Sequence, residues 1–182
     1  MALSHYSLPR PDFDKPVKLL IVVAPFYREI ADMLLAGARA ELDAAGATHD
    51  TVEVPGALEV PTAIRIAYRQ ARFDGFVALG CVIRGETTHY ETVCNDSSRA
   101  IQLLGLEGAC IGNGILTVEN EAQALVRADP AQANKGAGAA AAALHLIALT
   151  RRFGPEPKGV GFRPGGRDTL LAAEAADGPT RV

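Results

Sequence analysis

Hydrophobic positions along the chain follow two alternating patterns. Continuous apolar runs rich in β-branched residues, such as VKLLIVVA at residues 17–24, are typical of strands buried on both faces of a parallel sheet. Between these runs, apolar residues recur every three or four positions, which is the spacing of one helix face. The predicted strands are residues 17–24, 48–54, 75–83 and 109–117, and the predicted helices are residues 26–46, 60–71, 90–104, 119–128 and 134–153.

Strands that alternate with helices in this way predict a doubly wound α/β fold. We expect a four-stranded parallel sheet in flavodoxin-like order, flanked by helices as a three-layer α/β/α sandwich. Residues 1–16 are rich in proline and polar groups and are interpreted as an N-terminal arm, with the domain at residues 17–153. Residues 154–182 are rich in glycine and proline without sustained periodicity, which predicts a flexible C-terminal tail.

Composition excludes several classes of protein. The 182 residues suit about one domain, and the net charge of −3 offers no basic field for nucleic acid. No apolar run reaches the roughly 18 to 20 residues that cross a bilayer, and the first residues lack the apolar core of a signal peptide, so we expect a cytoplasmic protein with no membrane partner. The cysteines form no C-x-x-C pair and the histidines lack metal spacing, which argues against a metal site.

The unusual residues of the chain follow the predicted strands, at the sheet edge where parallel folds bind ligands. The segment RGETTH, residues 84–89, is the most informative. Thr88 and Glu91 fit the T-x-x-E capping box of a helix start, with Thr88 as the N-cap. The backbone N–H groups before it, beside a positive helix end, suit a phosphate. His89 would be the first helical residue, where the positive end favours a neutral imidazole that can transfer protons.

Each candidate also has a purely structural explanation. RGETTH could be only a capped helix start, Arg127 a cation at a helix C-terminus, and Glu59 a first-turn carboxylate. Phe26 could be a core residue. The segment at residues 136–141 fits G-x-G-x-x-A, the relaxed dinucleotide fingerprint, but no strand precedes it, and the surrounding alanines favour close helix packing.

Five segments together resemble the lumazine synthase family. They are VPGALEVP (54–61), GCVIRGETTHYETVCND (80–96), GILTVEN (114–120), QALVRA (123–128) and NKG (134–136). The resemblance covers about residues 17–152 in one collinear order, and the second segment is the most specific. It implies the condensation of 5-amino-6-(D-ribitylamino)uracil with 3,4-dihydroxy-2-butanone 4-phosphate, which releases phosphate and water without a metal or an organic cofactor.

The resemblance also implies roles for individual residues. His89 matches the catalytic histidine, Glu86 and Thr87 match the phosphate loop, and Arg127 matches an arginine that clamps the phosphate from a neighbouring subunit. The residues matched to the pyrimidine and ribityl contacts are Phe26, Ala57, Leu58, Glu59, Cys81, Val82 and Ile83. Asn113 departs from the phenylalanine common at its position, so the neighbour's contribution to the pyrimidine pocket would be polar here.

The implied assembly is a homopentamer with active sites between subunits. Residues 128–136 lack the glycines usual between the last two helices of shell-forming relatives, which favours a free pentamer over a sixty-subunit shell. Two alternatives stay open from the sequence. One is an archaeal-type riboflavin synthase, against which the TTH block counts. The other is a non-catalytic flavin- or lumazine-binding scaffold, against which the presence of His89 and Arg127 counts.

Overall fold

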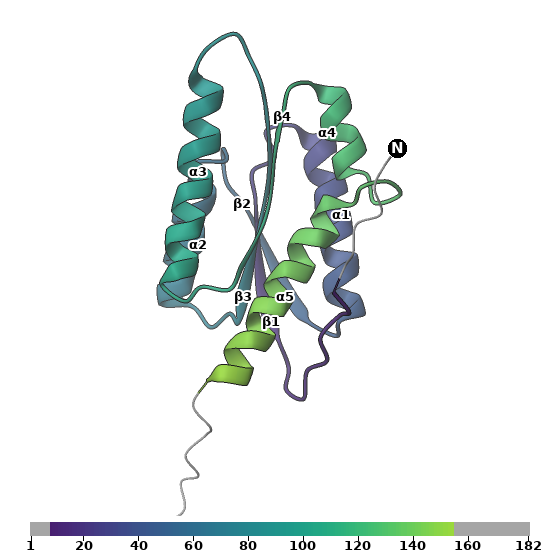
Figure 1. Ribbon diagram of the computed structural model, residues 1–182, viewed down its shortest axis with the longest axis vertical. Helices are drawn as coiled ribbons and strands as arrows, with labels where there is room; N and C mark the ends of the chain where they lie inside the picture. The colour runs from purple at the N-terminus through teal and green to yellow at the C-terminus, as the bar shows by residue number, and fades with distance from the viewer. Residues whose placement is uncertain (1–7, 155–182) are drawn as a thin grey trace, which may run out of the picture.

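A four-stranded parallel sheet in the order β2-β1-β3-β4 forms the centre of the computed structural model, which describes residues 8–154 (Figure 1). The strands are β1 (Lys18–Val23), β2 (Thr48–Glu53), β3 (Gly75–Ile83) and β4 (Ile111–Val118). The helices are α1 (Arg28–Ala44), α2 (Glu59–Gln70), α3 (His89–Leu106), α4 (Glu121–Ala128) and α5 (Lys135–Phe153). This order confirms the predicted flavodoxin-like fold. The bounds of β3 match the prediction, and α3 is longer at both ends than predicted.

Two helical layers cover the sheet. Helices α2 and α3 lie on one face, and α1, α4 and α5 lie on the other (Figure 1). The central strand β1 serves both layers because successive side chains point to opposite faces. Leu19, Ile21 and Val23 pack with α1 and α5, whereas Leu20 and Val22 pack with α2 and α3. This double burial explains why the strand sequence is continuously apolar.

Helix α5 packs unusually close to its neighbours through glycine. A Cβ added at Gly136 would overlap the carbonyl oxygen of Leu34 in α1, and one added at Gly112 in β4 would overlap the carbonyl oxygen of Ala139. Asn134 precedes the helix with a positive φ of 43°, and its side-chain oxygen accepts a hydrogen bond from the Ala137 N–H. The G-x-G-x-x-A segment is therefore a packing feature, as its alanine-rich context predicts.

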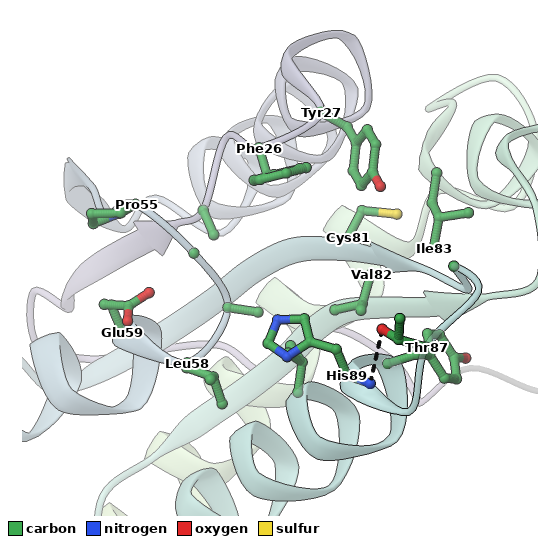
Figure 2. Close-up of a pocket in the computed structure, with 16 residues that line it drawn as sticks. Phe26, Tyr27, Pro55, Leu58, Glu59, Cys81, Val82, Ile83, Thr87 and His89 are labelled. Atoms are coloured by element: carbon green, nitrogen blue, oxygen red, sulfur yellow. Dashed lines mark hydrogen bonds between the residues drawn. The ribbon is translucent and has the colours of Figure 1, made fainter.

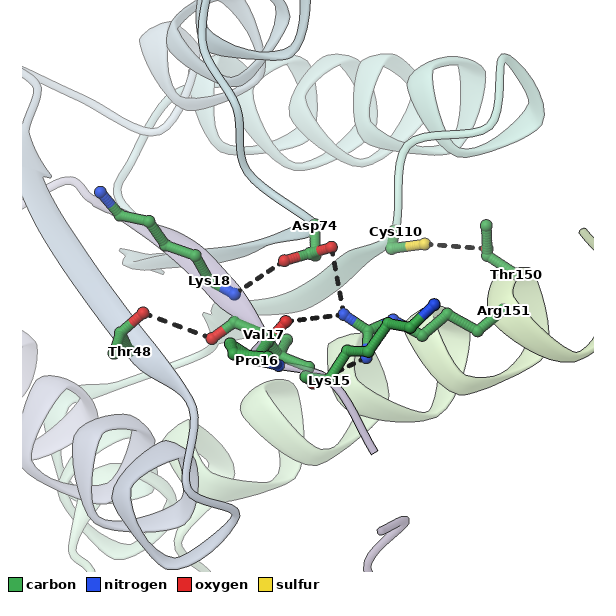
Figure 3. A network of polar contacts seen from close by, with 9 residues as sticks. All are labelled: Lys15, Pro16, Val17, Lys18, Thr48, Asp74, Cys110, Thr150 and Arg151. Carbon is green, nitrogen blue, oxygen red and sulfur yellow. Dashed lines mark hydrogen bonds and ion pairs between the residues drawn. The ribbon is translucent and has the colours of Figure 1, made fainter. Parts of the chain in front are cut away.

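A polar network at the amino end of the sheet holds the described part of the arm (Figure 3). Arg151 of α5 donates to the carbonyl oxygens of Lys15 and Pro16 at 2.9 and 2.8 Å. Asp74 accepts from the backbone N–H of Lys18 at 2.8 Å and pairs with Arg151 at 3.4 Å. The arm thus docks against α5 before it enters β1.

The predicted division into arm, domain and tail remains a prediction, because residues 1–7 of the arm and residues 155–182 of the tail lie outside the described residues. Within residues 8–154, no helix combines the length and the apolar character that crossing a membrane requires. All three cysteines are free thiols, of which Cys81 and Cys110 are buried and Cys94 is half-buried.

Candidate active site

A cavity of about 480 Å³ opens at the carboxyl ends of β1 and β3, between the starts of α2 and α3. Figure 2 shows that loops and strand ends far apart in the sequence converge on it. Most of the residues that the sequence predicted for the site line this cavity. They are Phe26, Ala57, Leu58, Glu59, Cys81, Val82, Ile83, Thr87 and His89. The parallel topology brings them together, because the carboxyl ends of all strands meet at one edge.

One side of the cavity is aromatic. Phe26 follows β1, and its side chain is 74% exposed, which excludes the alternative that it is a core residue. Its ring meets that of Tyr27 edge-on, with 5.1 Å between the centroids. Tyr27 also lines the cavity and faces β3 in Figure 2. The sequence analysis missed Tyr27, although its position directly after Phe26 at a strand end was a usable signal.

The floor of the cavity is formed by the end of β3. Cys81, Val82 and Ile83 contribute side chains from consecutive positions of this strand. Burial, and secondarily the nearby Cys94, raise the pKa of the Cys81 thiol to about 11. The thiol is therefore neutral near pH 7. The floor is accordingly uncharged at Cys81, Val82 and Ile83.

The helix start beside the cavity differs from the predicted capping box. Thr88 is the N-cap of α3, as predicted, but its side chain makes no capping hydrogen bond. Its backbone is helical, with φ −67° and ψ −1°, whereas a capping side chain requires an extended residue. The Thr87 hydroxyl instead accepts from the His89 N–H at 3.4 Å. Glu91 is paired with the Arg84 guanidinium, so its carboxylate is engaged there and not in the second hydrogen bond of the capping box.

His89 begins α3, which agrees with the capping-box interpretation but is one residue before the predicted helix range, and the residue is exposed. Figure 2 shows the imidazole reaching from this helix start toward Leu58, across the floor at Val82. It can therefore meet a molecule bound in the cavity. Thr87 lines the same end of the cavity, so a proton-transfer group and a hydroxyl lie beside a positive helix terminus.

Three predicted residues lie outside the cavity lining. Glu86 is exposed in the loop before α3. Asn113 lies on the edge strand β4, accepts from the Ile115 N–H at 3.0 Å, and lines a second, polar hollow of about 280 Å³ beside α3. Arg127 is exposed in the last turn of α4 and donates to the Gln123 carbonyl oxygen at 3.1 Å. In the part of one chain that the structure describes, residues 8–154, Asn113 and Arg127 do not line the cavity.

Comparison with known proteins identifies the family. The family model of 6,7-dimethyl-8-ribityllumazine synthase matches residues 16–151, which is most of the chain and contains every residue of the cavity. The chain belongs to the 6,7-dimethyl-8-ribityllumazine synthase family.

Similar proteins named 6,7-dimethyl-8-ribityllumazine synthase include one from Jannaschia sp. (strain CCS1), which is 58% identical over 179 residues that cover 98% of both chains. One from Sphingopyxis alaskensis is 60% identical over 136 residues, covering 75% of this chain and 96% of the relative. The protein named 6,7-dimethyl-8-ribityllumazine synthase 1 from Rhizobium meliloti is 54% identical, covering 78% and 97%.

The cavity also bears on the purely structural explanation of the RGETTH segment. A capped helix start alone would not explain why His89 and Thr87 open into a cavity lined by Phe26 and the end of β3. The similar proteins described above are all named lumazine synthases, which favours that activity over the sequence alternative of an archaeal-type riboflavin synthase.

Proposed function

We propose that this chain condenses 5-amino-6-(D-ribitylamino)uracil with 3,4-dihydroxy-2-butanone 4-phosphate to form 6,7-dimethyl-8-ribityllumazine. The observation that carries the proposal is the cavity itself. It combines an exposed aromatic ring, a neutral apolar floor, and a histidine at a helix N-terminus beside a threonine. Family membership supplies the reaction, and the cavity offers a place for each part of the two substrates.

The pyrimidine would stack against Phe26 and rest on the floor formed by Cys81, Val82 and Ile83. The ribityl chain would extend along Ala57, Leu58 and Glu59, where the Glu59 carboxylate can accept hydrogen bonds from its hydroxyls. Because burial raises the pKa of Cys81 to about 11, this thiol does not compete with the substrate amine for the ketone.

The phosphate of the four-carbon substrate would bind at the start of α3. Backbone N–H groups at a helix N-terminus attract anions, and Glu86 and Thr87 lie in the loop that precedes it. A contact through the backbone does not depend on the side chain at position 86. His89, at the first helical position, would then lie next to the reacting carbon chain.

The reaction would proceed by successive condensations. The substrate amine attacks the ketone to give a carbinolamine, and loss of water forms an imine. Elimination of phosphate and ring closure with loss of a second water complete the lumazine. His89 would serve the proton transfers, while most of the acceleration comes from holding two reactive molecules in the correct orientation.

We further propose a homopentamer whose sites are completed by the adjacent subunit. In support, Arg127 and Asn113 are exposed and lie outside the cavity of their own chain, where they are available to a neighbour. A neighbour's Arg127 would clamp the phosphate, and its Asn113 would offer an amide to the pyrimidine. We expect the free pentamer, in the cytoplasm. A stable and active monomer in analytical ultracentrifugation would contradict this assembly.

Product formation from the two purified substrates tests the proposed function. Incubation of both should yield the lumazine chromophore and release one equivalent of inorganic phosphate. Incubation with lumazine alone should yield no riboflavin. A protein that binds lumazine or flavin but does not convert the two substrates would be a non-catalytic scaffold, and the proposal would be wrong.

A further inference from the structure

Arg84 occupies the junction between β3 and the loop that precedes α3. Its backbone N–H donates to the Val118 carbonyl oxygen at 2.9 Å, which continues the pairing of β3 with β4 one residue beyond Ile83. Its side chain leaves the strand and makes three further contacts. The backbone of Arg84 is therefore still held by the sheet, and the loop toward α3 begins after it.

The guanidinium of Arg84 joins two separate elements. Its Nε donates to the Glu119 carboxylate at 2.7 Å, and Glu119 directly follows β4. Its Nη1 pairs with Glu91 in the first turn of α3. The guanidinium group also lies over the Tyr90 ring, with 4.1 Å between the guanidinium carbon and the ring centroid. One side chain thus ties the first turn of α3 to the end of β4.

The loop between these contacts has few other restraints. Residues 84–89 are all exposed, and a Cβ added at Gly85 would meet nothing within 4 Å. Thr88 does not cap the helix, and the Thr87 contact to the His89 N–H is long at 3.4 Å. In the part of the chain that the structure describes, the hydrogen bonds of Arg84 to Glu91 and Glu119 are shorter than the Thr87 contact within this loop.

The same contacts have an electrostatic consequence. Glu91 lies in the first turn of α3, at the helix end where the substrate phosphate is expected. The hydrogen bond from Arg84 lowers the pKa of Glu91, as expected for a carboxylate paired with a cation. A carboxylate without its partner would repel a phosphate, and Glu119 would add a second negative charge. The Arg84 cation offsets this repulsion.

We propose that Arg84 is a positioning residue for the phosphorylated substrate. It holds the 85–88 loop between β3 and α3, and it neutralises the carboxylate of Glu91 at the helix start. This inference rests on the proposed function, because it assumes that the phosphate binds at this loop. It assigns Arg84 no contact with the reacting atoms.

Steady-state kinetics of Arg84→Met and Arg84→Lys test the role. We expect Arg84→Met to raise the KM for the butanone phosphate about tenfold, with the KM for the pyrimidine changed less than about twofold. Lysine keeps the charge but cannot bridge two carboxylates in a fixed plane, so it should restore part of the loss. Arg10→Met is the matched control. Arg10 pairs with Glu41 at 2.9 Å, and its side chain is 42% exposed, against 40% for Arg84.

The double variant Arg84→Met/Glu91→Gln separates charge from folding. If Arg84 acts by neutralising Glu91, removal of that carboxylate should recover a large part of the affinity for the butanone phosphate. A double variant as poor as the single one would refute the neutralisation of Glu91 and would leave the holding of the loop as the only role of Arg84. Equal rises in both KM values, or no change in either, would also overturn the proposal.

Binding of inorganic phosphate gives a readout that does not depend on turnover. Phosphate should raise the melting temperature of the wild-type protein and of Arg10→Met, and it should do so less for Arg84→Met and Arg84→Lys. If the wild-type protein binds phosphate but forms no lumazine, the proposed function fails while the role of Arg84 can still be measured. If Arg84→Met does not fold, Arg84→Lys carries the comparison.

Discussion

Arg127→Ala distinguishes a structural helix cation from a ligand contact supplied to another subunit. Among residues 8–154 of its own chain, the Arg127 side chain makes one hydrogen bond, to the Gln123 carbonyl oxygen in α4, and the residue is exposed. A cation at an exposed helix C-terminus is worth about 0.3–1 kcal/mol. On this contact alone, the substitution should lower the melting temperature only slightly and leave the kinetics unchanged.

A contact with the substrate phosphate would have a larger and more selective effect. A charge-assisted hydrogen bond contributes about 1.5–3 kcal/mol, which corresponds to roughly a 10- to 150-fold rise in the KM for the butanone phosphate. The KM for the pyrimidine should change far less. Lysine should rescue the activity only in part, because it cannot form the bidentate contact of a guanidinium.

The assay is steady-state formation of lumazine, with each substrate varied in turn, for the wild type, Arg127→Ala and Arg127→Lys. Arg69→Ala is a suitable control, because Arg69 is an exposed arginine in the last turn of α2. A crystal grown with sulfate should show the anion between the 86–88 backbone of one subunit and Arg127 of the next. Equal effects on both KM values, or an anion at the loop with Arg127 out of reach, would refute the reasoning.

Three other predictions concern catalysis, packing and pH. His89→Ala should lower kcat by a factor near the lower end of about 10²–10⁴, because orientation of the substrates persists; an unchanged kcat would return the residue to a structural role. Gly136→Ala should destabilise the fold by about 1–3 kcal/mol in denaturant unfolding, because its Cβ would overlap the Leu34 carbonyl oxygen. Gly138→Ala, with nothing within 4 Å of the added Cβ, should instead stabilise α5 by about 1 kcal/mol, and the same sign for both would contradict the packing argument. Folding raises the pKa of Cys81 from 9.0 to about 11, so its contribution to stability is present below pH 9 and is lost as the pH rises toward 11; Cys81→Ala should flatten this alkaline decline in melting temperature.

The fold was predictable because burial on both faces of a parallel sheet leaves a clear pattern in the sequence. Buried strands such as β3 are continuously apolar, and the helices between them keep the spacing of one buried face. The cavity was predictable for a related reason. Once the strands are parallel, the segments after Ala24, Val54 and Ile83 must approach one another at a single edge.

The prediction of a capping box failed because a local sequence pattern does not show which other residues compete for the same side chains. The T-x-x-E spacing is present, but Glu91 forms an ion pair with the guanidinium of Arg84, and Thr88 adopts a helical backbone conformation. Arg84 itself was missed as a positioning residue, since its partner Glu119 is 35 residues away in sequence. The roles proposed for Arg127 and Asn113 would need a second subunit, because among residues 8–154 of one chain both lie outside the cavity lining.

The network of Arg151 with Lys15 and Pro16 has a practical consequence for engineering. It fixes the end of α5 beside the start of β1, at the edge of the sheet opposite the cavity (Figures 1 and 3). Within one chain, the last turn of α5 therefore lies on the side of the domain remote from the cavity (Figure 1). A fluorophore or surface linker attached in this last turn would lie at the opposite end of the sheet from the cavity, so this turn is the place to choose for labelling or immobilisation.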